Sequence, residues 1–232
     1  MCIRDRVNDG GSGGFYAAMK EAFNRGYDWL WLMDDDGLPD RKELKELYNK
    51  SVEYHLQYAN ALVLDIKDPT HFSFGLSKGR LVYTVEDAKK KPVIEDVANP
   101  FNGTFVSREV IEKIGFIKKE MFIWGDEIEY FLRTKKNRFK IATVPSAVHL
   151  HPKSVNKNNY ISFYNWKVPD VFGTRFICVH RNKGYIYSRY YGICGIIKYL
   201  IANTAIYVCN FQFKKWLLFI KYYFEGVFNY YK

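Results

Sequence analysis

Three consecutive aspartates, Asp34–Asp36, follow an apolar run that ends at Met33, and this junction most constrains how the chain can fold. The run Trp29–Met33 is typical of a strand that is buried on both faces. Ligands of open α/β sheets bind beyond the carboxyl ends of such strands. Carboxylates this close together need a cation to offset their repulsion, and hard oxygen ligands favour Mg²⁺ or Mn²⁺. A metal site is therefore expected here, with an acidic surface turn as the alternative.

Hydrophobic periodicity predicts strands that alternate with helices over much of the 232-residue chain. The expected helices cover residues 15–25, a segment from Pro39, and residues 107–114 and 126–133; the further strands cover 61–65, 101–106 and 140–152. Glu43 stands three residues after Asp40, which is the spacing of a capping box. Residues 66–98 are expected to be an insertion. This alternation predicts an α/β domain with a mostly parallel sheet flanked by helices.

Four glycines precede the first expected helix: Gly10, Gly11, Gly13 and Gly14. Bare backbone N–H groups and a helix N-terminus both attract anions, so this stretch is a candidate phosphate-binding loop that starts at Asn8. A flexible loop without a ligand remains an equally good interpretation of the same residues.

Two further segments carry side chains suited to catalysis or metal binding. Asp126 and Glu127 begin an expected helix after an aromatic segment, and a carboxylate there could act as a general base. The structural alternative is that Asp126 caps the helix and Glu129 completes a capping box. His151, before Pro152, could bind a metal ion, although a single histidine is more often structural.

The charge of the chain is concentrated at its C-terminus. The net charge is +10, and residues 171–232 contain nine Lys or Arg, one acid and 18 of the 42 aromatic side chains. The sequence thus predicts an α/β domain over residues 8–165, which carries the candidate catalytic residues, and a helical, basic, aromatic tail over 166–232. Residues 1–7 have the character of a scar or ragged start.

Basic and aromatic side chains together favour an anionic membrane surface as the partner of the tail. Residues 193–209 are largely apolar, but they are interrupted by Lys198, Asn203 and Thr204 and are short for a membrane span. A helical subdomain that covers the sheet is the alternative. No nucleic acid is expected as a partner, because no nucleic-acid-binding motif accompanies the charge.

Composition and cysteine spacing exclude several other classes of protein. With 48% hydrophobic and 26% charged residues, the chain is not a disordered tail or a small disulfide scaffold. The four cysteines form no CxxC pair, so neither a zinc ribbon nor a redox motif is present, and a reducing cytoplasm fits them best. Residues 1–6 lack the apolar core of a secretory signal.

Three blocks, taken in order, resemble glycosyltransferase family 2, in the bacterial branch that uses galactofuranose and rhamnose donors. The first joins Asn8–Phe15 to Trp29–Pro39, the second joins Asn102–Phe105 to Phe122–Arg133, and the third is Val144–Pro152. The resemblance implies a GT-A-type fold. Family members begin with a strand–helix–strand unit that holds the nucleoside, so we expect an incomplete first Rossmann half here, with weak donor binding or no activity.

The resemblance also implies roles for individual residues. Asp34, Asp36 and His151 would bind the metal ion, with His149 as a second choice to His151. Asp126 and Glu127 match the block that holds the catalytic base, and which of the two takes the proton stays open. The implied donor-site residues are Asn8, Gly10, Gly11, Gly13, Gly14, Asp35 and Trp124.

The implied activity is a metal-dependent, inverting sugar transfer that uses Mn²⁺ or Mg²⁺. The donor would be a nucleoside diphosphate sugar of the UDP-galactofuranose or dTDP-rhamnose type. The acceptor would be a glycan or a lipid-linked glycan of a growing cell-surface polysaccharide. The enzyme would be cytoplasmic and peripheral on the inner face of the plasma membrane. A non-catalytic membrane-associated fragment and a metal-dependent phosphoryl or nucleotidyl transferase are the alternatives.

Overall fold

The computed structural model describes residues 8–153 and 160–231, which group into two compact units. We call residues 15–117 and 130–153 the sheet unit, and residues 8–14, 118–129 and 160–231 the helical unit. The ragged start expected at residues 1–7 lies outside the described residues. Two helices, α1 and α5, contribute residues to both units.

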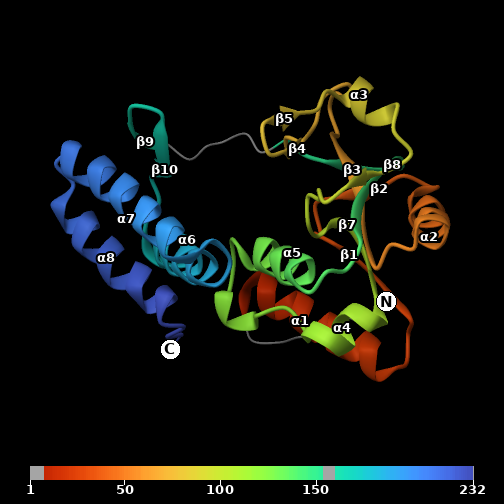
Figure 1. Ribbon diagram of the computed structural model, residues 1–232, viewed down its shortest axis with the longest axis horizontal. Coiled ribbons are helices and arrows are strands. Elements are labelled where there is room, and N and C mark those ends of the chain that lie inside the picture. Colours follow the sequence, from red (N-terminus) through yellow and green to blue (C-terminus); the bar gives the residue numbers. More distant parts are fainter. Residues whose placement is uncertain (1–7, 154–159, 232) are drawn as a thin grey trace. The chain divides into compact units, whose positions relative to one another are not determined.

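The sheet unit contains a six-stranded sheet with the order β1-β7-β3-β8-β2, and β6 pairs with β8 (Figure 1). The strands of this sheet are β1 (Trp29–Met33), β2 (Leu38–Pro39), β3 (Tyr58–Asp65), β6 (Ile94–Glu95), β7 (Asn102–Ser107) and β8 (Ile141–His151). The other elements of this unit are α2 (Glu43–Tyr54), β4 (Ser77–Lys78), β5 (Leu81–Val82), α3 (Val85–Lys89), α4 (Arg108–Ile114) and the larger parts of α1 (Gly10–Asn24) and α5 (Asp126–Lys136). The α/β class is confirmed, and each long strand expected from the sequence is present.

The sheet is mixed, so the expectation that it is mostly parallel is wrong. Only β3 and β8 run parallel; β7 pairs antiparallel with both β1 and β3, and β2 and β6 pair antiparallel with β8. Alternation along the sequence implies parallel strands only when each connection is a single crossover helix. Here β3 and β7 are joined by the long segment 66–101, which lets the chain re-enter the sheet from the opposite end.

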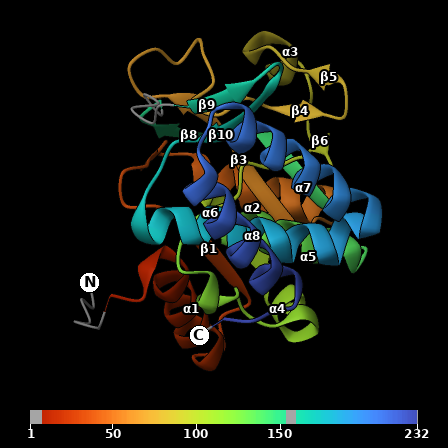
Figure 2. The same cartoon turned by 90° about the vertical axis from the view of Figure 1, so that its left-hand side faces the viewer.

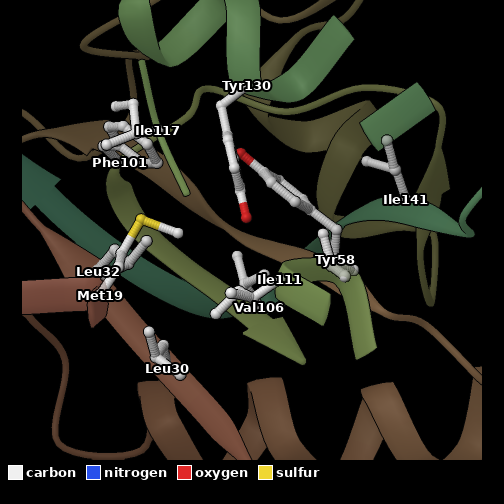
Figure 3. Packing of buried hydrophobic residues seen from close by; sticks show 11 residues of the cluster. Met19, Leu30, Leu32, Tyr58, Phe101, Val106, Ile111, Ile117, Tyr130 and Ile141 are labelled. Carbon is white, nitrogen blue, oxygen red and sulfur yellow. The ribbon is translucent and has the colours of Figure 1, made fainter. Parts of the chain in front are cut away.

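One hydrophobic core lies between the sheet and α1, α4 and α5 (Figure 3). Leu30 and Leu32 of β1 face this core, and Tyr58 and Tyr130, both with no exposed surface, fill its centre. The alternate residues of β1, Trp29 and Trp31, pack into a second cluster on the other face of the sheet. Strand β1 is therefore covered on both faces, as its apolar sequence predicts.

The first helix begins earlier than the sequence predicts. Helix α1 starts at Gly10, so the four glycines form its first turns rather than a separate loop. The Asn8 Oδ1 atom accepts a hydrogen bond from the Gly10 backbone N–H at 3.0 Å, which caps the helix. A Cβ atom at Gly10 would lie 2.2 Å from the Phe122 carbonyl oxygen, and Gly10 has a φ of +69°, so glycine is required there.

The helical unit contains the C-terminal helices α6 (Gly173–Ile186), α7 (Gly192–Cys209) and α8 (Phe213–Val227), which pack on one another (Figure 2). A π-helical segment, η2 (Tyr187–Tyr191), joins α6 to α7; the hairpin β9 (Tyr160–Phe163) and β10 (Trp166–Pro169) and the 3₁₀ turn η1 (Lys119–Met121) complete the unit. Its core is mainly aromatic, and it includes Phe176, Tyr207, Phe219 and Tyr223. The helical character expected for the tail is confirmed.

One helix run, Gly173–Cys209, is long and apolar enough to cross a membrane, with a mean hydropathy of 1.5 over its most apolar window, of which 17% is buried. This run is longer than the segment 193–209 that the sequence analysis considered. Length and composition alone do not distinguish a membrane span from an exposed helix of a water-soluble protein.

Candidate metal and acid sites

The aspartate cluster lies in a tight turn between β1 and β2. The Asp34 backbone N–H donates to the Phe101 carbonyl oxygen at 3.0 Å, and the Gly37 N–H lies 3.4 Å from the Asp34 carbonyl oxygen. Strand β2 then pairs with β8, with Leu38 opposite Leu150. This short pairing brings the turn to the end of β8, where His151 stands.

Asp34, Asp36 and His151 offer ligand atoms that all lie within 4.8 Å of one another. We call these three residues, as candidate ligands of a metal ion, the metal-ligand cluster. The His151 Nε2 atom is 3.0 Å from the Asp36 Oδ1 atom. The two aspartates are exposed, whereas His151 is buried. Among the described residues, this is the one group of at least three such side chains close enough to share a metal ion.

The surroundings of His151 leave its Nε2 atom available to a metal ion. The Nδ1 atom lies 2.7 Å from the Pro152 carbonyl oxygen and 3.3 Å from the Ser73 hydroxyl. A carbonyl can only accept, so Nδ1 donates to Pro152 and Nε2 is the ring nitrogen that faces the Asp36 carboxylate. Histidines that bind metals have this arrangement, in which the other ring nitrogen donates to a carbonyl or carboxylate. The two carboxylates suit Mn²⁺ or Mg²⁺, and the imidazole favours Mn²⁺ of these two, because imidazole is a ligand of transition metals.

His149, the second choice for a metal ligand, is outside this group. It has no exposed surface, and its Nδ1 atom lies 3.1 and 3.2 Å from the two carboxylate oxygens of Glu43. Its ring packs directly against Gly37, where a Cβ atom would lie 2.2 Å from Nε2. His149 therefore packs against the end of the turn and does not join the metal-ligand cluster.

Glu43 is a residue whose importance the sequence analysis missed. Its side chain was expected to complete a capping box, but it is fully buried and also accepts a hydrogen bond from the Trp31 indole N–H at 3.3 Å. The sequence gives no signal for this inward orientation, because Asp40 followed by Glu43 fits a cap equally well. The Glu43–His149 pair joins α2 and β8 behind the aspartate turn.

The second acidic site is in the helical unit. Asp126 is buried, Glu127 is partly buried, and the Glu127 Oε2 atom accepts a hydrogen bond from the Gly125 N–H at 3.0 Å. Burial, together with the charge of Asp126, raises the pKa of Glu127 to about 8. A carboxylate with a pKa near neutrality is matched to general-base catalysis, because it is both available and basic. The structural alternative was a capping box from Asp126 to Glu129; in the structure Asp126 is the first residue of α5 rather than the residue before it, and the Glu129 Oε1 atom accepts from the Tyr190 hydroxyl at 2.6 Å.

The expected donor-site residues are distributed over both units. Asn8 lines a cavity of about 430 Å³ in the helical unit, together with Phe122, Thr174 and Arg181. The Arg175 guanidinium lies over the Trp124 ring, with its Cζ atom 5.6 Å from the ring centre. Asp35 is exposed in the turn of the sheet unit.

Sequence comparisons identify the class of protein to which this chain is related. It is 32% identical over 194 residues to galactofuranosyltransferase GlfT1 of Mycobacterium tuberculosis. This match covers 81% of this chain and 64% of that protein. It is 29% identical over 197 residues to GlfT1 of Mycolicibacterium smegmatis, covering 81% of this chain and 65% of the relative. The chain is thus a homologue of glycosyltransferases, as the motifs predict. The named relatives are galactofuranosyltransferases, and the chain spans 64–65% of their length, which is slightly less than two thirds.

No protein-family model matches the chain. Among solved structures, it is similar to GalNAc-T7 with UDP, GalNAc and Mn²⁺, with a TM-score of 0.48 and 14% identity over 81% of this chain and 39% of that one. It is also similar to S. aureus TarS, with a TM-score of 0.44 and 10% identity over 94% of this chain and 43% of that one.

Removing one member of the metal-ligand cluster should weaken binding of Mn²⁺. We expect Asp36→Asn and His151→Ala each to raise the dissociation constant by roughly 10-fold or more, because each removes one of three ligands. Calorimetric titration of the purified protein with Mn²⁺ measures this. Asp68→Asn is the matched control, since Asp68 also lies 2.9 Å from a histidine, His71, but outside the cluster. Equal affinities in all four proteins would contradict the assignment.

The raised pKa of Glu127 makes the stability of the fold depend on pH. The ordinary pKa is 4.5, so the folded state loses stability relative to the unfolded state as the pH rises from about 4.5 through about 8. Glu127→Gln removes the penalised charge. We therefore expect its melting temperature to exceed that of the wild type by more at pH 9 than at pH 5, as measured by calorimetry. Glu120→Gln, at an exposed position of the same unit, is the control; a gain for Glu127→Gln that does not change with pH would argue against a raised pKa.

Proposed function

We propose that the protein transfers a sugar, with galactofuranose as the first candidate and rhamnose as the second, from a nucleoside diphosphate donor to a glycan. The observation that carries the proposal is the cluster of Asp34, Asp36 and His151, in a chain homologous to galactofuranosyltransferases. A polysaccharide of the bacterial cell surface is the proposed product.

In the proposed mechanism, Asp34, Asp36 and His151 hold a divalent cation, Mn²⁺ or Mg²⁺. When bound, the cation supplies positive charge that stabilises the diphosphate leaving group. The acceptor hydroxyl oxygen forms the new bond to the anomeric carbon, and the bond from that carbon to the diphosphate oxygen breaks. The hydroxyl proton passes to the carboxylate pair Asp126–Glu127. A single displacement of this kind inverts the anomeric configuration and needs no covalent enzyme intermediate.

The pKa of about 8 supports Glu127 as the proton acceptor of the pair. Donor contacts are proposed for Asn8, Gly10, Gly11, Gly13, Gly14, Asp35 and Trp124. Of these, Asn8 has the most direct support, because it lines a cavity with Arg181, whose guanidinium can bind a phosphate or a carboxylate.

The test is a transfer assay with Mn²⁺, a panel of nucleoside diphosphate sugars and a glycan or lipid-linked glycan acceptor. We expect transfer from UDP-galactofuranose that rises with pH through about 8, and a kcat for Glu127→Gln that is lower by about 10²–10⁴-fold with little change in the donor KM. Asp36→Asn should lower the rate through weaker metal binding.

Glu225→Gln on α8, outside the cavity lined by Asn8, and Asp68→Asn are the controls for these two variants. Release of a nucleoside monophosphate or of pyrophosphate in place of a transferred sugar would indicate a phosphoryl or nucleotidyl transferase. Metal-independent vesicle binding without any turnover of a donor would indicate a non-catalytic membrane protein.

We further propose that the helical unit binds the inner surface of the plasma membrane, as a peripheral protein. Three isoleucines on α7, Ile193, Ile197 and Ile201, follow one another at intervals of four residues and are 47–67% exposed. On α8, Phe213 and Leu217 have the same spacing and are 52% and 62% exposed. Apolar side chains at this spacing form a stripe along one face of a helix, which suits the interface of a bilayer.

Exposed lysines accompany these stripes, including Lys198, Lys214 and Lys221. Each lysine near an anionic bilayer contributes about 1 kcal/mol, or roughly a fivefold change in affinity. We expect Lys198→Glu with Lys214→Glu to reduce cosedimentation with phosphatidylglycerol vesicles by at least that factor per site, and Ile197→Asp to reduce it further.

Val82→Asp is the matched control for the apolar change, because Val82 is 72% exposed in β5 of the sheet unit. Equal binding of the wild type to vesicles of phosphatidylcholine alone would argue against an anionic surface as the partner. Retention of Ile197→Asp on the vesicles would argue against the α7 stripe.

A further inference from the structure

The segment Met121–Glu127, which we call the acid loop, has an unusual backbone. Phe122 and Trp124 have φ values of +66° and +63°, in the left-handed region of the backbone map that residues other than glycine rarely adopt. Gly125 has a φ of +103°. Strained residues of this kind persist only when the surrounding structure holds them, and they cluster at functional sites. Some contact must therefore hold the acid loop in place.

The Asn182 side chain of α6 provides that contact. Its Nδ2 atom lies 2.9, 3.0 and 2.9 Å from the carbonyl oxygens of Met121, Ile123 and Trp124. These three carbonyls belong to the strained part of the loop. Asn182 has no exposed surface, so its amide group has no water to bond with instead.

The other end of the same amide is also fixed. The Asn182 Oδ1 atom accepts a hydrogen bond from the Tyr231 hydroxyl at 3.2 Å. The orientation of the amide is thereby determined, because the hydroxyl donates to the oxygen and the carbonyls accept from the nitrogen. Both polar atoms of the Asn182 side chain are thus bonded: Nδ2 holds the acid loop, and Oδ1 fixes the orientation of the amide.

A short chain of bonds connects Asn182 to the proposed base. Asn182 holds the Trp124 carbonyl, Gly125 is the next residue, and the Gly125 N–H donates to the Glu127 carboxylate. We infer that Asn182 is a positioning residue, which sets the place and the solvation of the Glu127 carboxylate through the backbone of the acid loop. This inference rests on the proposed role of Glu127 as the base.

The inference gives the C-terminal tail a second role, independent of any membrane. Asn182 lies on α6 and Tyr231 follows α8, so both contacts come from the 166–232 segment. Asp126 on α5 and Lys183 on α6 are charged groups that interact with Glu127; burial lowers the pKa of Lys183, and Glu127 opposes that shift. A change at Asn182 leaves both charged groups in the chain.

Asn182→Ala tests the inference, and Asn203→Ala is the matched control. Asn203 is also a buried asparagine of the helical unit, but its amide bonds to Tyr199 in its own helix and not to the acid loop. Hydrogen exchange of the full chain should be faster at the amides of residues 121–127 in Asn182→Ala and unchanged there in Asn203→Ala. This readout does not depend on activity.

The kinetic readouts separate positioning from a general loss of structure. In Asn182→Ala we expect kcat to fall by roughly 10- to 100-fold with little change in the donor KM. The midpoint of the kcat–pH profile should fall from about 8 towards the ordinary 4.5, since a released loop admits water to Glu127. Tyr231→Phe, which removes only the bond to Oδ1, should shift both quantities in the same direction by less, and it serves if Asn182→Ala does not fold.

Unchanged exchange of the acid loop in Asn182→Ala would overturn the inference. Faster exchange with the kcat and pH midpoint of Asn203→Ala would overturn it as well, because the loop would then be held without consequence for the base. A wild-type protein that transfers no sugar would instead contradict the proposed function, and the exchange experiment would still decide whether Asn182 holds the loop.

Discussion

The metal-ligand cluster of the sheet unit depends on the backbone pairing of β8 with β2 and β3. Pairing with β3 fixes the strand in the middle of the sheet, and pairing with β2 anchors the turn that carries Asp34 and Asp36. His149 and His151 are two residues apart and therefore share one face of β8. One of them is bound to Glu43, and the other faces Asp36. A single strand thus supplies both the buried support of the turn and a candidate ligand.

The two acidic sites use carboxylates in opposite physical settings. Asp34 and Asp36 are exposed, so their carboxylates stay hydrated in the folded protein. Folding therefore does not carry the free-energy cost of burying these two charges. Asp126 is buried and Glu127 is partly buried, and burial, together with the charge of Asp126, raises the pKa of Glu127 to about 8. Hydrated carboxylates suit a metal ion, and a desolvated pair suits the uptake of a proton. This division of environments is the physical basis of the roles proposed for them.

The helical unit has an aromatic core on its inside and apolar and basic side chains on its outside. Its inner surface is an aromatic core that includes the fully buried His180, whose Nε2 atom bonds to the Tyr207 hydroxyl at 2.8 Å and whose pKa burial lowers to about 3. Its outer surface has apolar stripes and lysines. The acid loop packs within this same unit through Asn182. The basic and aromatic composition of the tail therefore reflects a packed aromatic core as well as a surface for a partner.

The sequence by itself determined the α/β class, the long strands, the position of the aspartates at the end of β1 and the block that holds Asp126 and Glu127. These features are local, because periodicity and the ends of apolar runs are set by neighbouring residues. Only the tertiary structure decided that the sheet is mixed and that Gly10–Gly14 are helical. It alone placed Glu43 and Asn182, because the partners of Glu43 and Asn182 lie 106 and about 60 positions away along the chain. Side chains that a sequence pattern assigns to a cap or a helix face can be redirected by such distant contacts.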